Sequence, residues 1–220
     1  MPVLVEKVTF SSAAGSVRLE GSLGRDTGIA AASGIVLCHP HPLYGGSMDN
    51  NVVSALFRAF TRAGYVTLAF NFRGVGGSEG RYEDGEGEAG DVEGAIRFLE
   101  GLPWVRPESL GLWGYSFGAW VGLRAAARGD RVRCLGAVAP PTGLYSFEFL
   151  AGCKHPFYAI SGNEDPFCPA ASRDALLPLL EAVKEWRILQ GVDHFFWGRE
   201  EEMARFACQA FHPHLSSGCR

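Results

Sequence analysis

The segment from residue 110 to residue 128, LGLWGYSFGAWVGLRAAAR, constrains the fold more than any other part of the chain. Residues 110–113 form an apolar run typical of a buried strand, and residues 119–128 have the apolar spacing of a helix. The Gly-Tyr-Ser-Phe-Gly motif between them leaves room only for a sharp turn. A serine on such a turn takes a strained backbone conformation, and flanking glycines let strand and helix approach closely. The segment therefore predicts a strand, a tight turn carrying Ser116, and a helix.

The same order, an apolar strand followed by a helix, recurs along the chain. Two strand-like segments come first and are spaced as an antiparallel pair. The later alternation indicates an α/β fold, with a mostly parallel sheet and helices on both faces. The expected strands are 3–10, 17–23, 34–39, 65–72, 110–113, 132–139, 157–161 and 186–190, and the expected helices are 50–63, 91–99 with Asp91 as N-cap, 119–128, 173–182 and 200–211.

Composition limits the class of protein. With 220 residues, 47% of them hydrophobic, the chain can bury the core of a single domain spanning 1–220. A net charge of −4 without a basic stripe argues against a nucleic-acid partner. The N-terminus lacks a signal-peptide pattern, and every apolar run is shorter than the roughly 20 residues that cross a bilayer. We therefore expect a cytoplasmic protein with no membrane partner.

The cysteines fit that expectation. No C-x-x-C pair occurs, and a chain of this size without a secretory pattern favours free thiols over a disulfide framework. The cysteines are Cys38, Cys134, Cys153, Cys168, Cys208 and Cys219.

Chemically reactive residue types follow the ends of several expected strands. In sheets of this kind, ligands bind beyond the carboxyl ends of the strands. The residues at those positions are His39 and His41, Arg73, Ser116, Asp165 and His194. Their common placement predicts a site at that edge of the sheet.

Ser116, Asp165 and His194 have the residue types and the chain order of a catalytic triad on an α/β sheet. A serine hydroxyl needs a base within hydrogen-bond reach, and the base needs a carboxylate that fixes its tautomer. Glu164 and Asp193 are the alternative acids, but Asp193 adjoins His194, and neighbouring side chains on an extended segment point apart. Taken alone, the serine motif also fits a plain glycine turn. The later acid and histidine favour a nucleophile.

Two other patterns suggest ligand binding less strongly. His39 and His41 could share an ion, but no third ligand lies nearby in sequence, so we expect no metal and no cofactor. The glycines after Arg73 do not match a phosphate-binding loop and fit a tight exit from a strand that packs the neighbouring loop. Residues 79–93 carry many acids, and we expect most of them to lie on a solvated loop and helix start.

The chain resembles the α/β-hydrolase superfamily over nearly its whole length, and within it the small capless hydrolases related to dienelactone hydrolases. The matching segments are CHPHPLYGGSM (38–48), FNFRGVGGS (70–78), GYSFG (114–118) and DHFF (193–196). Dienelactone hydrolases use a cysteine nucleophile where this chain has Ser116. The acid loop of the group, Gly-Asp-x-Asp, here reads Gly-Asn-Glu-Asp and ends at Asp165.

The resemblance implies an oxyanion hole, an absent lid and an aromatic pocket. The oxyanion donors would be the backbone N–H groups of Phe117 and of His41, with Leu43 as the alternative to His41. Between residues 140 and 156 the chain is too short for a helical cap, which implies an open pocket. The expected pocket residues are Tyr44, Tyr145, Phe147, Phe167 and Phe195.

These features predict a serine hydrolase that cleaves carboxylic esters or thioesters of small to medium acyl groups through an acyl-enzyme. Its partner would be a small ester-like molecule, and the sequence does not indicate an oligomeric state. Two alternatives remain: amide or peptide cleavage on the same residues, and a non-catalytic scaffold that only binds ligands. The scaffold has no need to keep all three triad residues.

Overall fold

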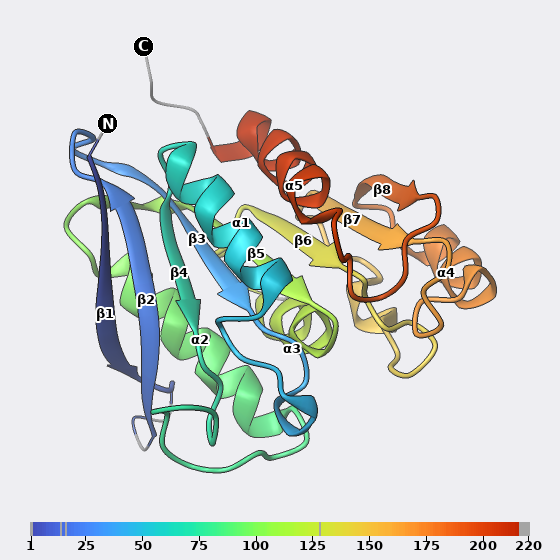
Figure 1. The fold of residues 1–220 in the computed structure, drawn as a ribbon, viewed down its shortest axis with the longest axis horizontal. Coiled ribbons are helices and arrows are strands. Elements are labelled where there is room, and N and C mark those ends of the chain that lie inside the picture. The colour runs from blue at the N-terminus through green and yellow to red at the C-terminus, as the bar shows by residue number, and fades with distance from the viewer. Residues whose placement is uncertain (1, 14, 16, 128, 216–220) are drawn as a thin grey trace.

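The computed structural model describes residues 2–13, 15, 17–127 and 129–215. Its strands form one eight-stranded sheet in the order β1-β2-β4-β3-β5-β6-β7-β8 (Figure 1). The strands are β1 (Val3–Ser11), β2 (Arg18–Asp26), β3 (Ala32–Cys38), β4 (Val66–Phe70), β5 (Val105–Tyr115), β6 (Cys134–Val138), β7 (Phe157–Gly162) and β8 (Val183–Leu189). β2 pairs antiparallel with both β1 and β4, and every other neighbouring pair is parallel. The predicted mostly parallel sheet with antiparallel N-terminal strands is confirmed.

Helices cover both faces of the sheet, with α1 and α5 on one face and α2 and α3 on the other (Figure 1). The helices are α1 (Asn51–Arg62), α2 (Glu86–Glu100), α3 (Phe117–Ala126), α4 (Ala170–Leu176) and α5 (Glu200–Leu215). Strand β5 shows how the two cores form. Trp113 packs against Phe211 of α5 at 5.1 Å between ring centroids, while the adjacent Leu112 lies in the core on the opposite face.

Two expected helices differ from the structure. Helix α2 begins at Glu86, so Asp91 lies inside the helix, fully buried, and is not its N-cap. Helix α4 ends at Leu176 and continues only as the short 3₁₀ turn Leu177–Leu179, because Pro178 has no N–H with which to extend a helix. The expected helix end at Arg128 and the cysteine at Cys219 lie outside the described residues. The other cysteines are free thiols.

The connection from β6 to β7 carries no lid. It contains only the 3₁₀ turn Glu148–Leu150, which confirms the expected absence of a cap. The carboxyl ends of the central strands are therefore left uncovered.

Among the described residues, no helix combines the length and the apolar composition needed to cross a bilayer.

Candidate active site

Ser116 lies on the predicted turn between β5 and α3, with φ +54° and ψ −121°. Such a positive φ is strained for a residue with a side chain. The neighbouring glycines make the turn possible, since a Cβ atom at Gly118 would lie 2.4 Å from the carbonyl oxygens of Cys38 and His39. A Cβ atom at Gly114 would lie 2.3 Å from the carbonyl oxygen of Gly118. The turn presents the serine hydroxyl beyond the end of the strand.

His194 and Asp165 complete a chain of hydrogen bonds that begins at Ser116. The Ser116 hydroxyl lies 2.9 Å from His194 Nε2, and His194 Nδ1 lies 2.8 Å from Asp165 Oδ2. Both partners come from loops at the same sheet edge, after β7 and β8. The imidazole and the carboxylate are buried, at 6% and 4% exposure, whereas Ser116 is partly exposed. The structure thus brings together the three residues that we predicted as a triad.

The Asp165 carboxylate is fixed by its own loop. Its Oδ1 accepts hydrogen bonds from the backbone N–H groups of Phe167 at 2.8 Å and Cys168 at 3.2 Å, which leaves Oδ2 for His194. Glu164 is exposed, and Asp193 is exposed and accepts from the N–H of Phe195 at 2.9 Å. Neither alternative acid is a hydrogen-bond partner of the imidazole.

Tyr115 anchors the loop that carries the histidine. Its hydroxyl donates to the backbone carbonyl of His194 at 3.0 Å, and its ring lies 5.5 Å from the imidazole. Burial raises the pKa of this phenol, so it remains a neutral donor. We did not identify Tyr115 from the sequence. Its position in the sequence could have identified it. Side chains alternate between the two faces of a sheet, so the residue before Ser116 points to the opposite face, towards the loop after β8.

The backbone N–H groups of the loop after β3 differ in whether they are hydrogen-bonded within the protein. His41 Nδ1 accepts from the N–H of Leu43 at 3.2 Å, so the donor of Leu43 is engaged within the loop. Burial lowers the pKa of His41, which favours the neutral imidazole that this bond requires. In the described part of the chain, the N–H groups of His41 and Phe117 have no protein acceptor. Of the N–H groups of Leu43 and His41, that of Leu43 is therefore engaged within the loop and that of His41 is not.

His39 is a structural residue. Its Nε2 accepts from the N–H of Phe72 at 3.0 Å, and its Nδ1–H donates to the carbonyl of Pro40 at 2.6 Å. It is fully buried, and burial lowers its pKa to about 4. Nε2 joins the end of β3 to the exit of β4, and Nδ1 is engaged within its own loop, so this imidazole does not suit a metal shared with His41. The described residues include no group of three or more His, Cys, Asp and Glu that could hold an ion.

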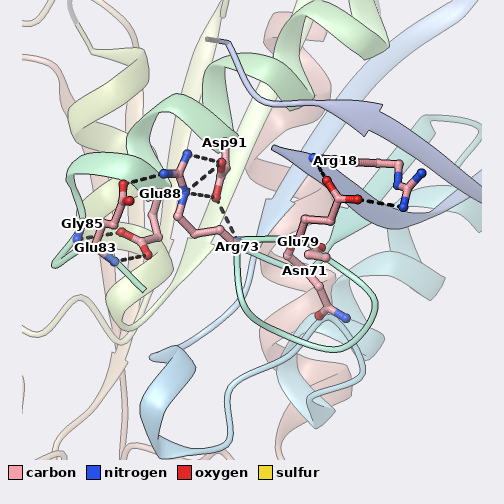
Figure 2. Close-up of polar contacts among 9 residues, drawn as sticks. Arg18, Asn71, Arg73, Glu79, Glu83, Gly85, Glu88 and Asp91 are labelled. Atoms are coloured by element: carbon pink, nitrogen blue, oxygen red, sulfur yellow. Dashed lines mark hydrogen bonds and ion pairs between the residues drawn. The ribbon is translucent and has the colours of Figure 1, made fainter. Parts of the chain in front are cut away.

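Arg73 organises a second buried polar cluster beside this loop (Figure 2). Its backbone N–H and its guanidinium both donate to the carboxylate of Asp91, and its remaining terminal nitrogen pairs with Glu83 at 2.5 Å. Glu88 accepts from the N–H groups of Glu83 and Gly85 at the start of α2. Most acids of residues 79–93 are exposed, as expected, whereas Glu88 and Asp91 are fully buried.

Asn71 connects this strand exit to the loop after β3. Its side-chain oxygen accepts from the N–H of Met48 at 2.8 Å, and its amide donates to Glu20 at 2.6 Å. Glu20 also accepts from the N–H of Gly77 at 2.6 Å. The glycine-rich exit of β4 thus packs beside the loop that carries His41, as the sequence predicts.

Ser116, together with Phe117 and His194, lines a cavity of about 810 Å³. Among the described residues, no Asp, Glu, Lys or Arg side chain lines this cavity. Its walls include four of the predicted aromatic residues: Tyr44, Tyr145, Phe167 and Phe195. The prediction for Phe147 is wrong. That side chain is 2% exposed and packs in the core with its ring 5.7 Å from that of Phe149, because the loop turns it inward.

Comparison with known proteins places this site in a family. Residues 2–163 match the family of X-Pro dipeptidyl-peptidases, S15. An uncharacterised protein of Rickettsia prowazekii (strain Madrid E) is 35% identical over 196 residues, which cover 86% of this chain and 82% of that protein.

Solved structures agree in fold. An α/β serine hydrolase homologue from Coxiella burnetii is 33% identical, with a TM-score of 0.83 over 93% of this chain and 96% of that chain. An α/β serine hydrolase without a lid, from Xanthomonas campestris, is 27% identical, with a TM-score of 0.85 over 100% of this chain and 99% of that chain. The chain belongs to the S15 family of X-Pro dipeptidyl-peptidases and is a lidless hydrolase of the α/β-hydrolase superfamily.

Proposed function

We propose that this hydrolase cleaves carboxylic esters or thioesters of small to medium acyl groups, with Ser116 as its nucleophile. One observation carries the proposal: the hydrogen-bonded series from Ser116 through His194 to Asp165, which opens into an uncharged cavity. A buried carboxylate bound to Nδ1–H leaves the lone pair of Nε2 facing the serine hydroxyl, as a general base requires.

In the first half of the reaction, Ser116 Oγ attacks the carbonyl carbon and His194 Nε2 takes its proton. The carbonyl oxygen becomes an oxyanion, for which the backbone N–H groups of Phe117 and His41 are the proposed donors. His194 then gives the proton to the leaving oxygen or sulfur. The carbon–heteroatom bond breaks, and the acyl group stays on Ser116 as an ester.

Water completes the cycle. His194 removes a proton from a water molecule, and the resulting hydroxide attacks the acyl-serine carbonyl. Collapse of the second tetrahedral intermediate releases the carboxylic acid, while the proton returns from His194 to Ser116. The cavity volume of about 810 Å³ lies in the usual range for small-molecule sites, and the uncovered edge of the sheet suits substrates of modest size.

The geometry favours esters over the peptides suggested by the family description. A dipeptidyl-peptidase must recognise the free ammonium group of its substrate, and a buried or cavity-lining carboxylate is the usual partner for such a group. No Asp or Glu side chain lines this cavity within the described residues. A non-catalytic scaffold is also less well supported, since the strain at Ser116, of order 1–3 kcal/mol, benefits a nucleophile but not a binding surface.

Location and partners follow as proposals from the same features. We propose a single cytoplasmic domain that acts on small molecules. The free cysteines of the described residues fit a reducing compartment, and the net charge of −4 does not suit nucleic acid.

The test replaces Ser116 by alanine and compares kcat/KM for a small ester and a small thioester. We expect Ser116→Ala to keep the thermal unfolding midpoint near the wild-type value and to lose several orders of magnitude in turnover. Ser146→Ala is the matched control, because Ser146 is an exposed serine on the nearby loop after β6. Substantial hydrolysis by a folded Ser116→Ala variant would remove the proposal.

A further inference from the structure

Two phenylalanines flank the imidazole of the proposed base. The ring of Phe167 lies 4.8 Å from that of His194 at an interplanar angle of 75°, and the ring of Phe195 lies 5.7 Å away at 87°. Both side chains line the cavity, with exposed fractions of 36% and 50%. Core packing does not account for two large apolar rings that are this exposed.

The reaction assigns these rings to one part of the substrate. The proton on His194 Nε2 must reach the leaving atom, which therefore lies within about 3 Å of that nitrogen at the moment of transfer. The group attached to the leaving atom then extends along the wall beside the imidazole. Phe167 and Phe195 form that wall.

The acyl chain takes another direction. At the tetrahedral carbon, one bond goes to Ser116 Oγ, the oxyanion faces the N–H groups of Phe117 and His41, and the leaving group faces His194. The fourth substituent is the acyl chain, and the loop after β6 offers an apolar wall for it. Leu144 and Tyr145 line the cavity there, and Tyr145 is fixed by stacking on Trp120 at 4.3 Å and 16°.

The charges around the opening disfavour an anionic leaving group. No charged side chain lines the cavity among the described residues. Asp193 is exposed directly before His194, and its carboxylate accepts from the N–H of Phe195, one of the two wall residues. A carboxylate or phosphate on the leaving group would approach this carboxylate without a partner of opposite charge in the lining.

We propose that the natural leaving group is an uncharged alcohol or thiol with an aromatic or bulky apolar body, bound between Phe167 and Phe195. The proposal rests on the proposed serine hydrolase function and assigns these two residues as determinants of leaving-group specificity. It separates them from Leu144 and Tyr145, which contact the acyl chain.

The experiment uses benzyl acetate, ethyl acetate and 4-carboxybenzyl acetate. All three give the same acetyl-enzyme, so their kcat/KM values differ only in binding and acylation. We expect the wild-type protein to favour benzyl acetate over each of the other two by about tenfold or more, the discrimination that an apolar pocket of this kind provides. Phe167→Ala and Phe195→Ala should each lower the benzyl-to-ethyl ratio by about tenfold.

Two control variants separate leaving-group from acyl recognition and apolar contact from charge. Leu144→Ala truncates an exposed apolar side chain on the other wall, so it should change the ratio of ethyl hexanoate to ethyl acetate rather than the benzyl-to-ethyl ratio. Asp193→Asn keeps the side-chain oxygen that accepts from Phe195 and removes the charge, so it should raise the relative kcat/KM for 4-carboxybenzyl acetate.

The outcomes distinguish a failure of the leaving-group assignment from a failure of the proposed function on which it rests. If Ser116-dependent hydrolysis is present but neither phenylalanine variant changes the benzyl-to-ethyl ratio, the leaving-group assignment is overturned and the serine hydrolase function stands. If the wild-type protein shows no Ser116-dependent hydrolysis of these esters or of a small thioester, the function itself is overturned.

Discussion

Two buried polar clusters lie at the same edge of the sheet, and they differ in how they end. In the Arg73 cluster, every guanidinium nitrogen donates to Asp91 or Glu83 (Figure 2). No residue of this cluster lines the cavity. In the Ser116 cluster, Asp165 and His194 are equally buried, but the series ends at a hydroxyl that faces the cavity. A pair of carboxylate and nitrogen group is structural where every donor is paired within the protein. It becomes available for chemistry where the last group faces a cavity.

The difference predicts opposite responses to mutation. Breaking a buried, fully paired charge cluster leaves an uncompensated charge in the interior, so the loss falls on the free energy of unfolding. The Ser116 cluster is open to the cavity. Breaking this open cluster removes a group that acts during the reaction, so the mutation lowers turnover.

The largest effect should come from Asp165→Asn. An amide in place of the carboxylate stabilises the wrong tautomer of His194, so kcat should fall by about 10⁴ while the thermal unfolding midpoint changes little. The controls are Glu164→Gln and Asp193→Asn, which alter exposed neighbours that do not bind the imidazole. If Glu164→Gln proves the crippling change in steady-state kinetics, the acid must be reassigned.

The second-largest effect concerns the Arg73 cluster. Asp91→Asn leaves the buried Arg73 guanidinium without its main partner, and the free energy of unfolding in urea should fall by about 3 kcal/mol. Ester turnover per folded molecule should stay near that of the wild type. Glu86→Gln is the matched control, because it breaks an exposed ion pair with Arg124, for which we expect a loss below about 1 kcal/mol. A large fall in turnover with unchanged stability would contradict the structural role.

The third effect tests the backbone donor of the open cluster. His41→Pro removes the N–H and should lower kcat by about a hundredfold, the scale of one lost oxyanion contact. His41→Ala keeps the N–H and removes only the ring that accepts from Leu43, so its loss should be modest. Inhibition by a phosphonate transition-state mimic should weaken in the proline variant alone. Equal losses in the two variants would mean that the imidazole matters more than the donor.

Sequence patterns predicted the features that depend on local periodicity. Alternation of apolar strands and helices led to the sheet, and the Gly-Tyr-Ser-Phe-Gly motif led to the strained turn at Ser116, because both features are set by neighbouring residues. The chain order also selected the Asp165 and His194 that the structure brings next to Ser116. Their catalytic roles remain predictions.

Features that depend on distant partners were not predicted. Asp91 has the residue type of an N-cap, but it is buried against its partner Arg73, which lies in the turn after β4. Phe147 lies on a loop near the cavity, and only the packing of that loop decides that it points inward. Tyr115 acts on a carbonyl contributed by a loop that follows much later in the chain. Local sequence patterns do not determine contacts between residues that are distant in the chain.

The central claim is that the open cluster makes Ser116 nucleophilic, and covalent labelling tests it most directly. A fluorophosphonate should add once to the wild-type protein in intact-mass analysis, with the adduct mapping to Ser116. Ser116→Ala should not react, Asp165→Asn should react far more slowly, and Asp91→Asn should react at the wild-type rate while folded. A wild-type protein that is not labelled, or a label that persists in Ser116→Ala, would contradict the account.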